Sequence, residues 1–470
     1  MDLARTQLFL DDELIESAFR LQRQVRPPKL LPEPIFKPHR PWEYRAVVLF
    51  GTVLHSPEND RLHMYYQVFA KEARRTFGTR ICLAVSDDGL HWERPAIGDV
   101  PFENSTDNNI ILDMPIGART LDSPSVIHDP DDPDESRRYK MLCFTESQEH
   151  DLMAAFSRDG VHWKWHPEPV SHVTGDRSNL IPTRVNGRFV HLNRHREMGR
   201  FNHPAGAGGR ACFLSTSEDF LHWTEPKLVL APDLADPPEL QFYAMAGFPY
   251  HDQYVGWVQR LWSNTDTLDI ELVTSRDGTN WRRLSCRGAF IPCGPTGSWY
   301  ETWIDLPSNA PLLRNGELWW YVSGRSCSHH TGEPHPYAAI GLASQRTNLM
   351  VGIVADAWPG QLTTKLINWP GGDLWLQLKG PSASPHIPGG VCQVRVVTPE
   401  GKPIEGFEPP CHQTHADYWT NQHWSRFRWD GGQRSLRELA GRTIKLQIHF
   451  DRLELYALRA GGENDPDDRW

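Results

Sequence analysis

The chain reads Ser-Asp-Asp-Gly-Leu-His-Trp at residues 86–92 and repeats this phrase, with small changes, at 157–163, 217–223 and 275–281. Each copy follows an apolar run that is typical of a β-strand, and the four tryptophans stand 58 to 71 residues apart. Such a period accommodates about four short strands with their turns, which is the size of a propeller blade. The repeat therefore predicts an all-β fold built from successive blades.

The phrase itself has the chemistry of a tight hairpin turn. Ser and Asp side chains accept hydrogen bonds from nearby backbone amides, and Gly adopts positive φ without strain. We expect the Trp to begin the outermost strand of its blade and to pack against the next blade. The repeated Asp and Trp residues are therefore assigned to stability and not to catalysis.

A fifth unit, over residues 310–344, ends without the Asp-Gly pair and without the Trp. We therefore predict a five-bladed β-propeller over residues 1–357, with a degenerate last blade. Beyond it the strand-like runs lack the phrase and are separated by Gly and Pro clusters. A C-terminal β-sandwich is expected over residues 358–460 and a flexible tail over 461–470.

Composition excludes several classes of function. At 470 residues the chain exceeds what one hydrophobic core usually serves, so two domains are expected. The formal net charge of −10, with no basic run, argues against a nucleic acid or an anionic membrane surface as partner. No apolar stretch has the roughly 18 residues that a membrane span needs. Because no signal segment opens the sequence, a cytoplasmic location is predicted, or a periplasmic or secreted one if a leader has been removed.

The cysteines predict no metal site and no cofactor. Eight are scattered along the chain, and Cys82, Cys143 and Cys212 lie in strand-like runs of successive repeats. Because no Cys-x-x-Cys pair occurs, buried and reduced thiols are expected. The sequence leaves assembly into a homo-oligomer open.

A five-bladed propeller with Ser-x-Asp-Gly-x-x-Trp turns and a following β-sandwich resembles the glycoside hydrolases of families 32 and 43 and their relatives. The segments 8–12, 41–43, 341–344 and 362–365 are similar to a bacterial family-32-like group. The resemblance covers about residues 8–460. It implies a site in the central funnel, where the first strand of each blade supplies carboxylates that act as nucleophile or base, transition-state stabiliser and general acid.

Four of the five blades offer a carboxylate at or near the innermost strand. Asp122 heads the second blade's innermost strand, in a Leu-Asp-Ser-Pro-Ser-Val context similar to the Asp-Pro-x-Val segment of those families. Asp176 takes the matching place in the third blade, where the families carry a Glu as acid. Glu239 precedes the fourth innermost strand, and Glu301 lies in the fifth among three aromatic residues.

The first blade departs from the pattern, because its innermost run, residues 46–54, contains no carboxylate. Glu43, just upstream, is the nearest substitute. Asp11 and Asp12 are the other option, if the N-terminal strand joins the funnel. Either the base has moved, or the protein does not carry out the familiar hydrolysis.

Substrate contacts are expected from aromatic and polar side chains near these carboxylates. An aromatic face suits the CH-rich face of a sugar ring, and an Arg in the funnel can recognise a carboxylate or sulfate on the sugar. The candidates are Trp42, Arg194, His195, Tyr243, Trp299, Tyr300 and Arg325.

These residues predict an exo-acting glycoside hydrolase that removes a terminal sugar, with furanoses among the candidates. Asp122, with Glu43 or Asp176, is predicted as base, nucleophile or stabiliser, and Glu239 or Asp176 as acid. A carboxylate separation of about 5 Å indicates retention and one of roughly 6.5–9.5 Å indicates inversion. Two alternatives remain: a carbohydrate-binding protein that has lost catalysis, and a glycoside phosphorylase similar to those of family 130, which needs a basic phosphate pocket.

Overall fold

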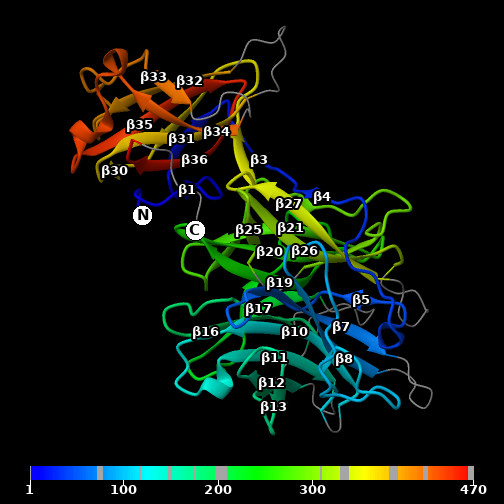
Figure 1. Ribbon diagram of the computed structural model, residues 1–470. Coiled ribbons are helices and arrows are strands. Elements are labelled where there is room, and N and C mark those ends of the chain that lie inside the picture. The colour runs from blue at the N-terminus through cyan, green and yellow to red at the C-terminus, as the bar shows by residue number, and fades with distance from the viewer. Residues whose placement is uncertain are drawn as a thin grey trace.

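The computed structural model describes residues 2–70, 78–115, 118–146, 151–172, 175–195, 209–306, 310–328, 338–380, 390–415 and 422–463. These residues form β-strands and short 3₁₀ helices and contain no α-helix, so the predicted all-β class is confirmed (Figure 1). Within the described ranges no helix is long and apolar enough to cross a membrane. The 3₁₀ helices are η1 (Pro41–Glu43), η2 (Glu135–Arg137), η4 (Asp430–Gly432) and η5 (Leu436–Leu439).

Three separate sheets follow one another along the chain, each beginning with the strand that stands at one edge. The first has the order β5-β7-β8-β9, with β6 against β7, the second β10-β11-β12-β13, with β14 against β12, and the third β15-β16-β17-β18. Their strands are β5 (Val47–Val48), β6 (Val53–Ser56), β7 (Arg61–Ala70), β8 (Gly78–Ser86), β9 (Ile110–Leu112), β10 (Thr120–His128), β11 (Tyr139–Glu146), β12 (Asp151–Ser157), β13 (Trp163–Trp165), β14 (Ser171–His172), β15 (Ser178–Leu180), β16 (Phe189–His195), β17 (Ala211–Ser217) and β18 (Lys227–Leu230).

A larger sheet comes next and consists of two halves. The order β19-β20-β21 is joined to β24-β26-β27-β4 through one parallel residue pair, Leu268 with Trp303. Short strands β22 and β23 flank β21, and β25 flanks β26. The bounds are β19 (Leu240–Tyr250), β20 (Gln253–Trp262), β21 (Thr267–Ser275), β22 (Trp281–Arg283), β23 (Ala289–Ile291), β24 (Trp303–Asp305), β25 (Leu312–Arg314), β26 (Glu317–Arg325), β27 (Ala338–Arg346) and β4 (Lys29–Leu30).

Two further sheets, at the upper left of Figure 1, contain the C-terminal strands and also the first strands of the chain. One has the order β3-β28-β36-β31-β34-β33 with β1 against β36, and the other β2-β29-β35-β30 with β32 against β35. Their strands are β1 (Gln7–Leu8), β2 (Ile15–Phe19), β3 (Gln22–Val25), β28 (Val351–Val354), β29 (Gly360–Thr364), β30 (Ile367–Asn368), β31 (Asp373–Lys379), β32 (Val391–Val397), β33 (His412–His415), β34 (Gln422–Arg428), β35 (Thr443–Asp451) and β36 (Glu454–Gly461).

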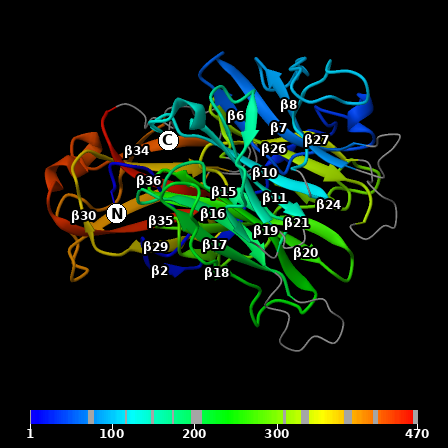
Figure 2. The same cartoon turned by 90° about the horizontal axis from the view of Figure 1, so that it is seen from below.

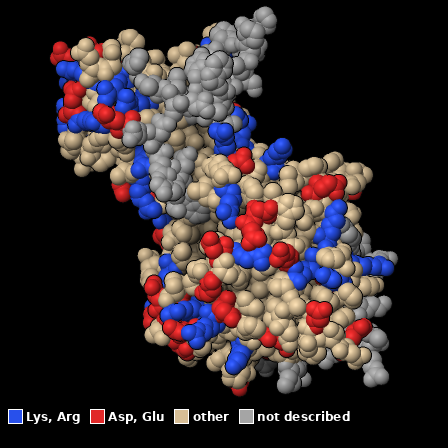
Figure 3. All heavy atoms as spheres, in the orientation of Figure 1, with Lys and Arg blue, Asp and Glu red and all other residues tan. Residues whose placement is uncertain are grey.

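One hydrophobic core is shared by these last two sheets, with Leu376 and Leu458 from one and Val394 and Ile448 from the other. A second core joins them to the larger sheet, because Trp375 of β31 clusters with residues of β20 and β26. Seen from below, the two groups of sheets lie side by side (Figure 2). Acidic and basic side chains alternate over the face in Figure 3, with no extended field of one sign among the described residues.

The four repeated turns have the predicted hydrogen bonds. In the first, Ser86 Oγ accepts from the Gly89 amide at 2.8 Å, and Asp88 Oδ1 accepts from the next two amides, each at 2.8 Å. Equivalent bonds close the other three turns. In each turn the Trp indole nitrogen donates to the carbonyl three residues earlier. The assignment of these residues to stability therefore has a direct structural basis.

Two details of the turns differ from expectation. In the third copy Phe220 stands where the others have Gly, and it adopts a φ of 71°. Its ring is fully buried and packs edge-on against Phe189 at 5.1 Å, so burial offsets the backbone strain. The prediction that the Trp packs on the next blade is wrong for the first two copies. Trp163 packs on Tyr65 of the preceding sheet, and Trp92 packs on β26 of the last one.

Candidate functional site

Side chains from the first strands of successive sheets gather in one place, because β10 contacts β15 and β15 contacts β19. Rings and guanidinium groups interleave there with carboxylates. We call this group the Asp122 cluster: Phe50, Asp122, Asp176, Arg177, Arg194, Arg210, Tyr243, Trp303, Asp305 and Arg325.

Asp122 lies on β10 at a β-bulge, where the register with β11 shifts between Asp122 and Ser125. Bulges commonly re-aim a side chain beside a functional site. Arg177 Nη1 donates to Asp122 Oδ1 at 3.2 Å, and Ser123 Oγ donates to the same oxygen at 3.0 Å. Arg177 in turn stacks on Phe50, with 3.4 Å from the guanidinium carbon to the ring centroid. The carboxylate is thus held from two neighbouring sheets.

Burial raises the pKa of Asp122 to about 6, from an ordinary value of 3.8. The negative charge of Asp176 raises it further, whereas the positive charges of Arg177 and Arg325 lower it. The side chain retains 21% exposure, so solvent or a ligand can reach it. A carboxyl group that titrates near neutrality can either donate or accept a proton under ordinary conditions.

Asp176 precedes β15 and forms an ion pair with Arg194, whose side chain is completely buried. The approach of the two chain segments requires a glycine at position 175, because a Cβ there would lie 2.2 Å from the carbonyl oxygen of Arg194. The Asp176 side chain is 29% exposed. Two partly exposed carboxylates, from adjacent sheets, therefore stand close enough to influence each other electrostatically.

The larger sheet supplies two aromatic rings of the cluster. Tyr243 on β19 and Trp303 on β24 meet edge-to-face with their centroids 6.1 Å apart. Arg325 lies 3.7 Å from the Trp303 ring and 3.5 Å from Asp305. Asp305 is buried and accepts from the Trp303 indole at 2.6 Å, as well as from Gln259 at 3.0 Å. These bonds fix Asp305 as the support of Trp303 and Arg325.

Sequence analysis predicted five members of this cluster: Asp122, Asp176, Arg194, Tyr243 and Arg325. The other five were not predicted: Phe50, Arg177, Arg210, Trp303 and Asp305. The sequence signal for Asp305 is the short Trp-Ile-Asp run of residues 303–305. Because side chains alternate along a strand, Trp303 and Asp305 lie on the same face there.

Glu43 lies apart from the cluster and is completely buried. Its Oε1 accepts from Tyr66 at 2.7 Å and pairs with Arg94 at 2.5 Å, and its Oε2 accepts from the amides of His39 and Arg40. Its lone pairs are therefore occupied by structural donors, and it is not free to act as a base in this conformation.

The other predicted carboxylates lie near the strands that carry the cluster. Glu239 is half-buried and immediately precedes β19. Glu301 is also half-buried, and its Oε2 accepts from the Gly297 amide at 2.8 Å, which closes a turn ahead of β24. Neither shares a hydrogen bond or ion pair with Asp122 or Asp176 among the described contacts.

The remaining predicted contacts are mostly packing residues. Trp42 is buried against Phe102 and donates to Asn109 at 2.9 Å. Trp299 is buried over Gly324, with Tyr300 packed beside it.

His195 ends β16 next to Arg194, is 6% exposed, and packs against Phe213 at 4.6 Å. It is thus the one member of this group that directly adjoins the cluster.

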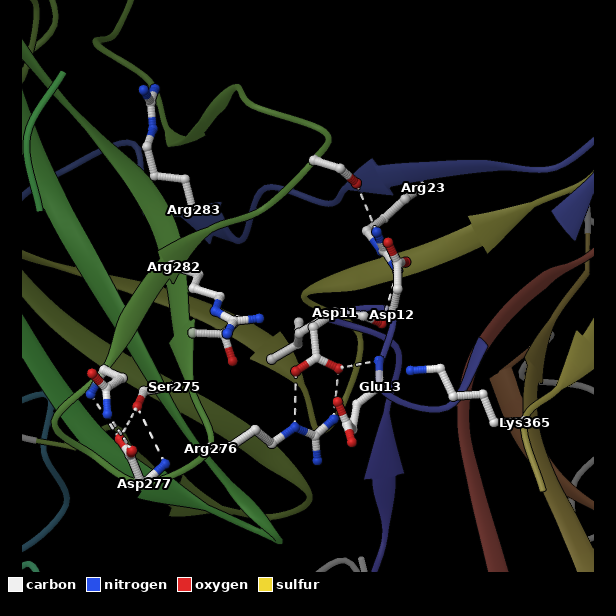
Figure 4. Close-up of a pocket in the computed structure, with 14 residues that line it drawn as sticks. Asp11, Asp12, Glu13, Arg23, Ser275, Arg276, Asp277, Arg282, Arg283 and Lys365 are labelled. Atoms are coloured by element: carbon white, nitrogen blue, oxygen red, sulfur yellow. Dashed lines mark hydrogen bonds and ion pairs between the residues drawn. The ribbon is translucent and has the colours of Figure 1, made fainter. Parts of the chain in front are cut away.

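A cavity of about 610 Å³ lies elsewhere, between the N-terminal segment, the turn before β22 and Lys365 (Figure 4). It includes Asp11 and Asp12, which sequence analysis offered as an alternative base. Asp11 forms a two-bonded pair with Arg276 at 2.7 and 2.8 Å, and Asp12 pairs with Arg23 at 2.6 Å. No member of the Asp122 cluster lines this cavity. Because both of these carboxylates are held in ion pairs, they offer weaker grounds for a catalytic role.

No family model and no curated protein matches the chain. Among solved structures it is similar to a fructofuranosidase from Schwanniomyces occidentalis in complex with fructosylnystose, at 11% identity over 90% of this chain and 96% of that one, with a TM-score of 0.45. A glycosyl hydrolase from Bacteroides ovatus shows 15% identity over 71% and 97%, with a TM-score of 0.45. A β-1,2-mannobiose phosphorylase from Listeria innocua shows 10% over 67% and 95%, with a TM-score of 0.44. With TM-scores below 0.5, these likenesses assign no activity.

Proposed function

We propose that this protein hydrolyses a glycosidic bond at the end of an oligo- or polysaccharide, with Asp122 and Asp176 as the catalytic carboxylates. The observation that carries the proposal is this pair itself. Both side chains are partly exposed, they come from adjacent sheets, and one has a pKa of about 6. Paired carboxyl groups with different environments are what glycoside hydrolysis requires.

We assign proton donation to Asp122 and the ionised role to Asp176. Loss of solvation in the partly buried site raises the pKa of Asp122 to about 6, and a general acid must hold its proton at the working pH. Asp176 is paired with the buried Arg194, which balances a negative charge. This reverses the assignment favoured by sequence analysis, which gave Asp122 the ionised role.

Tyr243 and Trp303 are each only 4% exposed and pack against arginines of the cluster, so we propose that they hold those arginines in place and do not stack on the sugar. The proposed substrate is a terminal sugar, and furanosides are among the compounds to test.

The sheet order supports a five-bladed propeller as the scaffold. Each of the first three sheets would be one blade, and the larger sheet would be two, because a single residue pair joins its halves. We propose residues 1–357 as the propeller domain and 358–460 as a β-sandwich, with the N-terminal strands β1 to β3 added to the sheets of the sandwich.

The test is a screen of aryl glycosides and oligosaccharides for released sugar, with and without inorganic phosphate. Wild type, Asp122→Asn and Asp176→Asn are compared with Asp131→Asn, a matched change at an exposed residue. We expect phosphate-independent release that both cluster variants lose and the control retains, with melting temperatures maintained.

Full activity in Asp122→Asn would remove that residue from the mechanism. Release that requires phosphate would indicate a phosphorylase instead. Saturable sugar binding without release by any variant would indicate a carbohydrate-binding protein.

A further inference from the structure

Ser123 lies where the first three sheets meet, beside Asp122. It follows Asp122 in the bulge of β10, and it is buried. Its backbone amide donates to Oε1 of Gln67, on β7 of the first sheet, at 3.2 Å. Its hydroxyl donates to the carbonyl oxygen of Asp176, just ahead of the third sheet, at 2.9 Å. A single residue therefore links all three sheets at the candidate site.

The backbone of Ser123 has a conformation that favours glycine. Its φ is 53°, in the left-handed region that residues with a Cβ seldom adopt. Glycine would take this conformation without strain, but glycine has no hydroxyl. Strain that is kept at a buried position beside two carboxylates points to a role for the side chain.

The Ser123 hydroxyl has one proton and two acceptors within reach. Its Oγ lies 3.0 Å from Oδ1 of Asp122 and 2.9 Å from the carbonyl oxygen of Asp176. Arg177 Nη1 donates to the same hydroxyl oxygen at 3.3 Å, which occupies one of its lone pairs. The hydroxyl proton can be given to only one of the two acceptors at a time.

The charge on Asp122 decides which acceptor the hydroxyl prefers. An ionised carboxylate is a stronger acceptor than a peptide carbonyl, whereas a neutral carboxyl group is not. We propose that Ser123 is a positioning residue that serves the two catalytic carboxylates alternately. Its hydroxyl donates to the Asp176 carbonyl while Asp122 holds its proton. It turns to Oδ1 of Asp122 once that proton has passed to the leaving oxygen of the sugar, and the serine keeps its own proton throughout.

This inference rests on the proposed function, since it adds a residue to the same site. It gives proton donation a local consequence, because the hydroxyl that stabilises the new carboxylate is withdrawn from the backbone of Asp176. The two carboxylates would then act as one unit, with Ser123 as the connection between them.

Other groups around Asp122 also act on its ionisation. Positive charges face it from Arg177 and Arg325, and a negative charge from Asp176. The thiol of Cys143, on β11, donates to the Asp122 carbonyl at 3.2 Å, and burial holds the pKa of this thiol well above its ordinary value. The test therefore changes the Ser123 hydroxyl alone and leaves these groups in place.

The first experiment follows ionisation directly and does not depend on turnover. The full chain, labelled with ¹³C at the carboxyl and carbonyl carbons of aspartate, is titrated by NMR. Signals of Asp122 and Asp176 are assigned by their loss in Asp122→Asn and Asp176→Asn. Ser123→Ala and Ser123→Gly both remove the hydroxyl, but only glycine is unstrained at this φ. Ser125→Ala is the control, because the Ser125 hydroxyl accepts from the Leu180 amide at 2.8 Å and has no described bond to either carboxylate.

Both Ser123 variants should raise the pKa of Asp122 by roughly half a unit to one unit, because its ionised form loses a donor. In wild type the carbonyl signal of Asp176 should move as Asp122 titrates. This movement should be smaller in both Ser123 variants, since the exchange of hydrogen bonds is lost. Ser125→Ala should titrate as wild type.

The second experiment measures sugar release at about pH 5, where Asp122 holds its proton in most molecules. Both Ser123 variants should lower kcat roughly tenfold and keep KM within about twofold of wild type, because Ser123 supports the carboxylates and does not bind the sugar. Ser125→Ala should keep the wild-type kcat per folded molecule.

An unchanged pKa of Asp122 in the folded Ser123 variants would overturn the inference. A shift in Ser123→Ala that is absent from Ser123→Gly would trace to backbone strain and would overturn it too. Wild-type kcat in both Ser123 variants would retain the hydrolase and reject the role of Ser123. The expected titrations in a protein that releases no sugar would retain the exchange of hydrogen bonds and reject the hydrolase.

Discussion

Replacing Arg177 should shift the pH dependence of activity, because this arginine sets part of the ionisation of Asp122. Burial raises the pKa of Asp122 to about 6, and Arg177, whose Nη1 lies 3.2 Å from the carboxylate, opposes that rise. At pH 7 a group with this pKa is protonated in roughly one molecule in ten, and at pH 5 in roughly nine in ten.

The direction of the shift follows from the charge that is removed. If Asp122 donates the proton, kcat/KM falls above about pH 6, close to tenfold per pH unit. An opposite charge this near lowers a carboxyl pKa by about one to three units. Arg177→Gln should therefore shift the decrease in kcat/KM to higher pH by about that amount. Arg177→Lys retains a positive charge and should leave the limb closer to its original position.

The assay is kcat/KM from about pH 4 to about pH 9 on the best substrate from the screen, with melting temperatures at each pH to separate unfolding from titration. Arg287→Gln controls for the loss of an arginine elsewhere. A limb that stays in place in folded Arg177→Gln would refute the assignment to Asp122. Activity that falls below pH 6, in place of above it, would show that Asp122 works in its ionised form.

Three other predictions concern stability and local geometry. The pKa of Asp122 is raised in the folded state, so its contribution to stability is complete below the ordinary value of 3.8 and is lost as pH rises through about 6. As pH rises between these values, the free energy of unfolding of Asp122→Asn, measured by urea denaturation, should therefore increase relative to that of wild type. A difference between the two proteins that does not change with pH would contradict this. Asp159→Ala, which removes the acceptor of two turn amides, should cost about 1–3 kcal/mol without changing sugar release per folded molecule. Gly175→Ala should abolish sugar release, because the new Cβ would lie 2.2 Å from the carbonyl oxygen of Arg194. Gly209→Ala should release sugar at the wild-type rate, because a Cβ at that position has no atom within 4 Å. Equal rates of sugar release by the two variants would disprove the packing argument.

The repeated turns could be predicted because their chemistry is local. Ser, Asp and Trp lie within seven residues, and the bonds among them do not depend on distant segments. Even Phe220 follows the pattern, since its buried ring offsets a φ that Gly would adopt freely. The sheet onto which each Trp packs is a tertiary choice, and the sequence pattern does not determine it.

The candidate site was only partly predictable, for a related reason. Asp122 and Asp176 could be found because each heads a first strand in a recognisable repeat. Asp305 lies on a three-residue strand of the degenerate unit, so Glu301 in the same segment was chosen in its place. Glu43 was chosen for its nearness along the chain, but its partner Arg94 is 51 residues away and buries it.

The pairing of the first four strands has a consequence for how the molecule is made. Along the chain they meet partners in reverse order: Gln7 with Leu458, Ile15 with Thr364, Val25 with Val351, and Leu30 with Ala343. Every one of these partners is more than 300 residues downstream. At translation rates of roughly 5–20 residues per second, the wait for them lasts about 15–90 s. Strands β1 to β4 are therefore synthesised long before the partners with which they form their native hydrogen bonds.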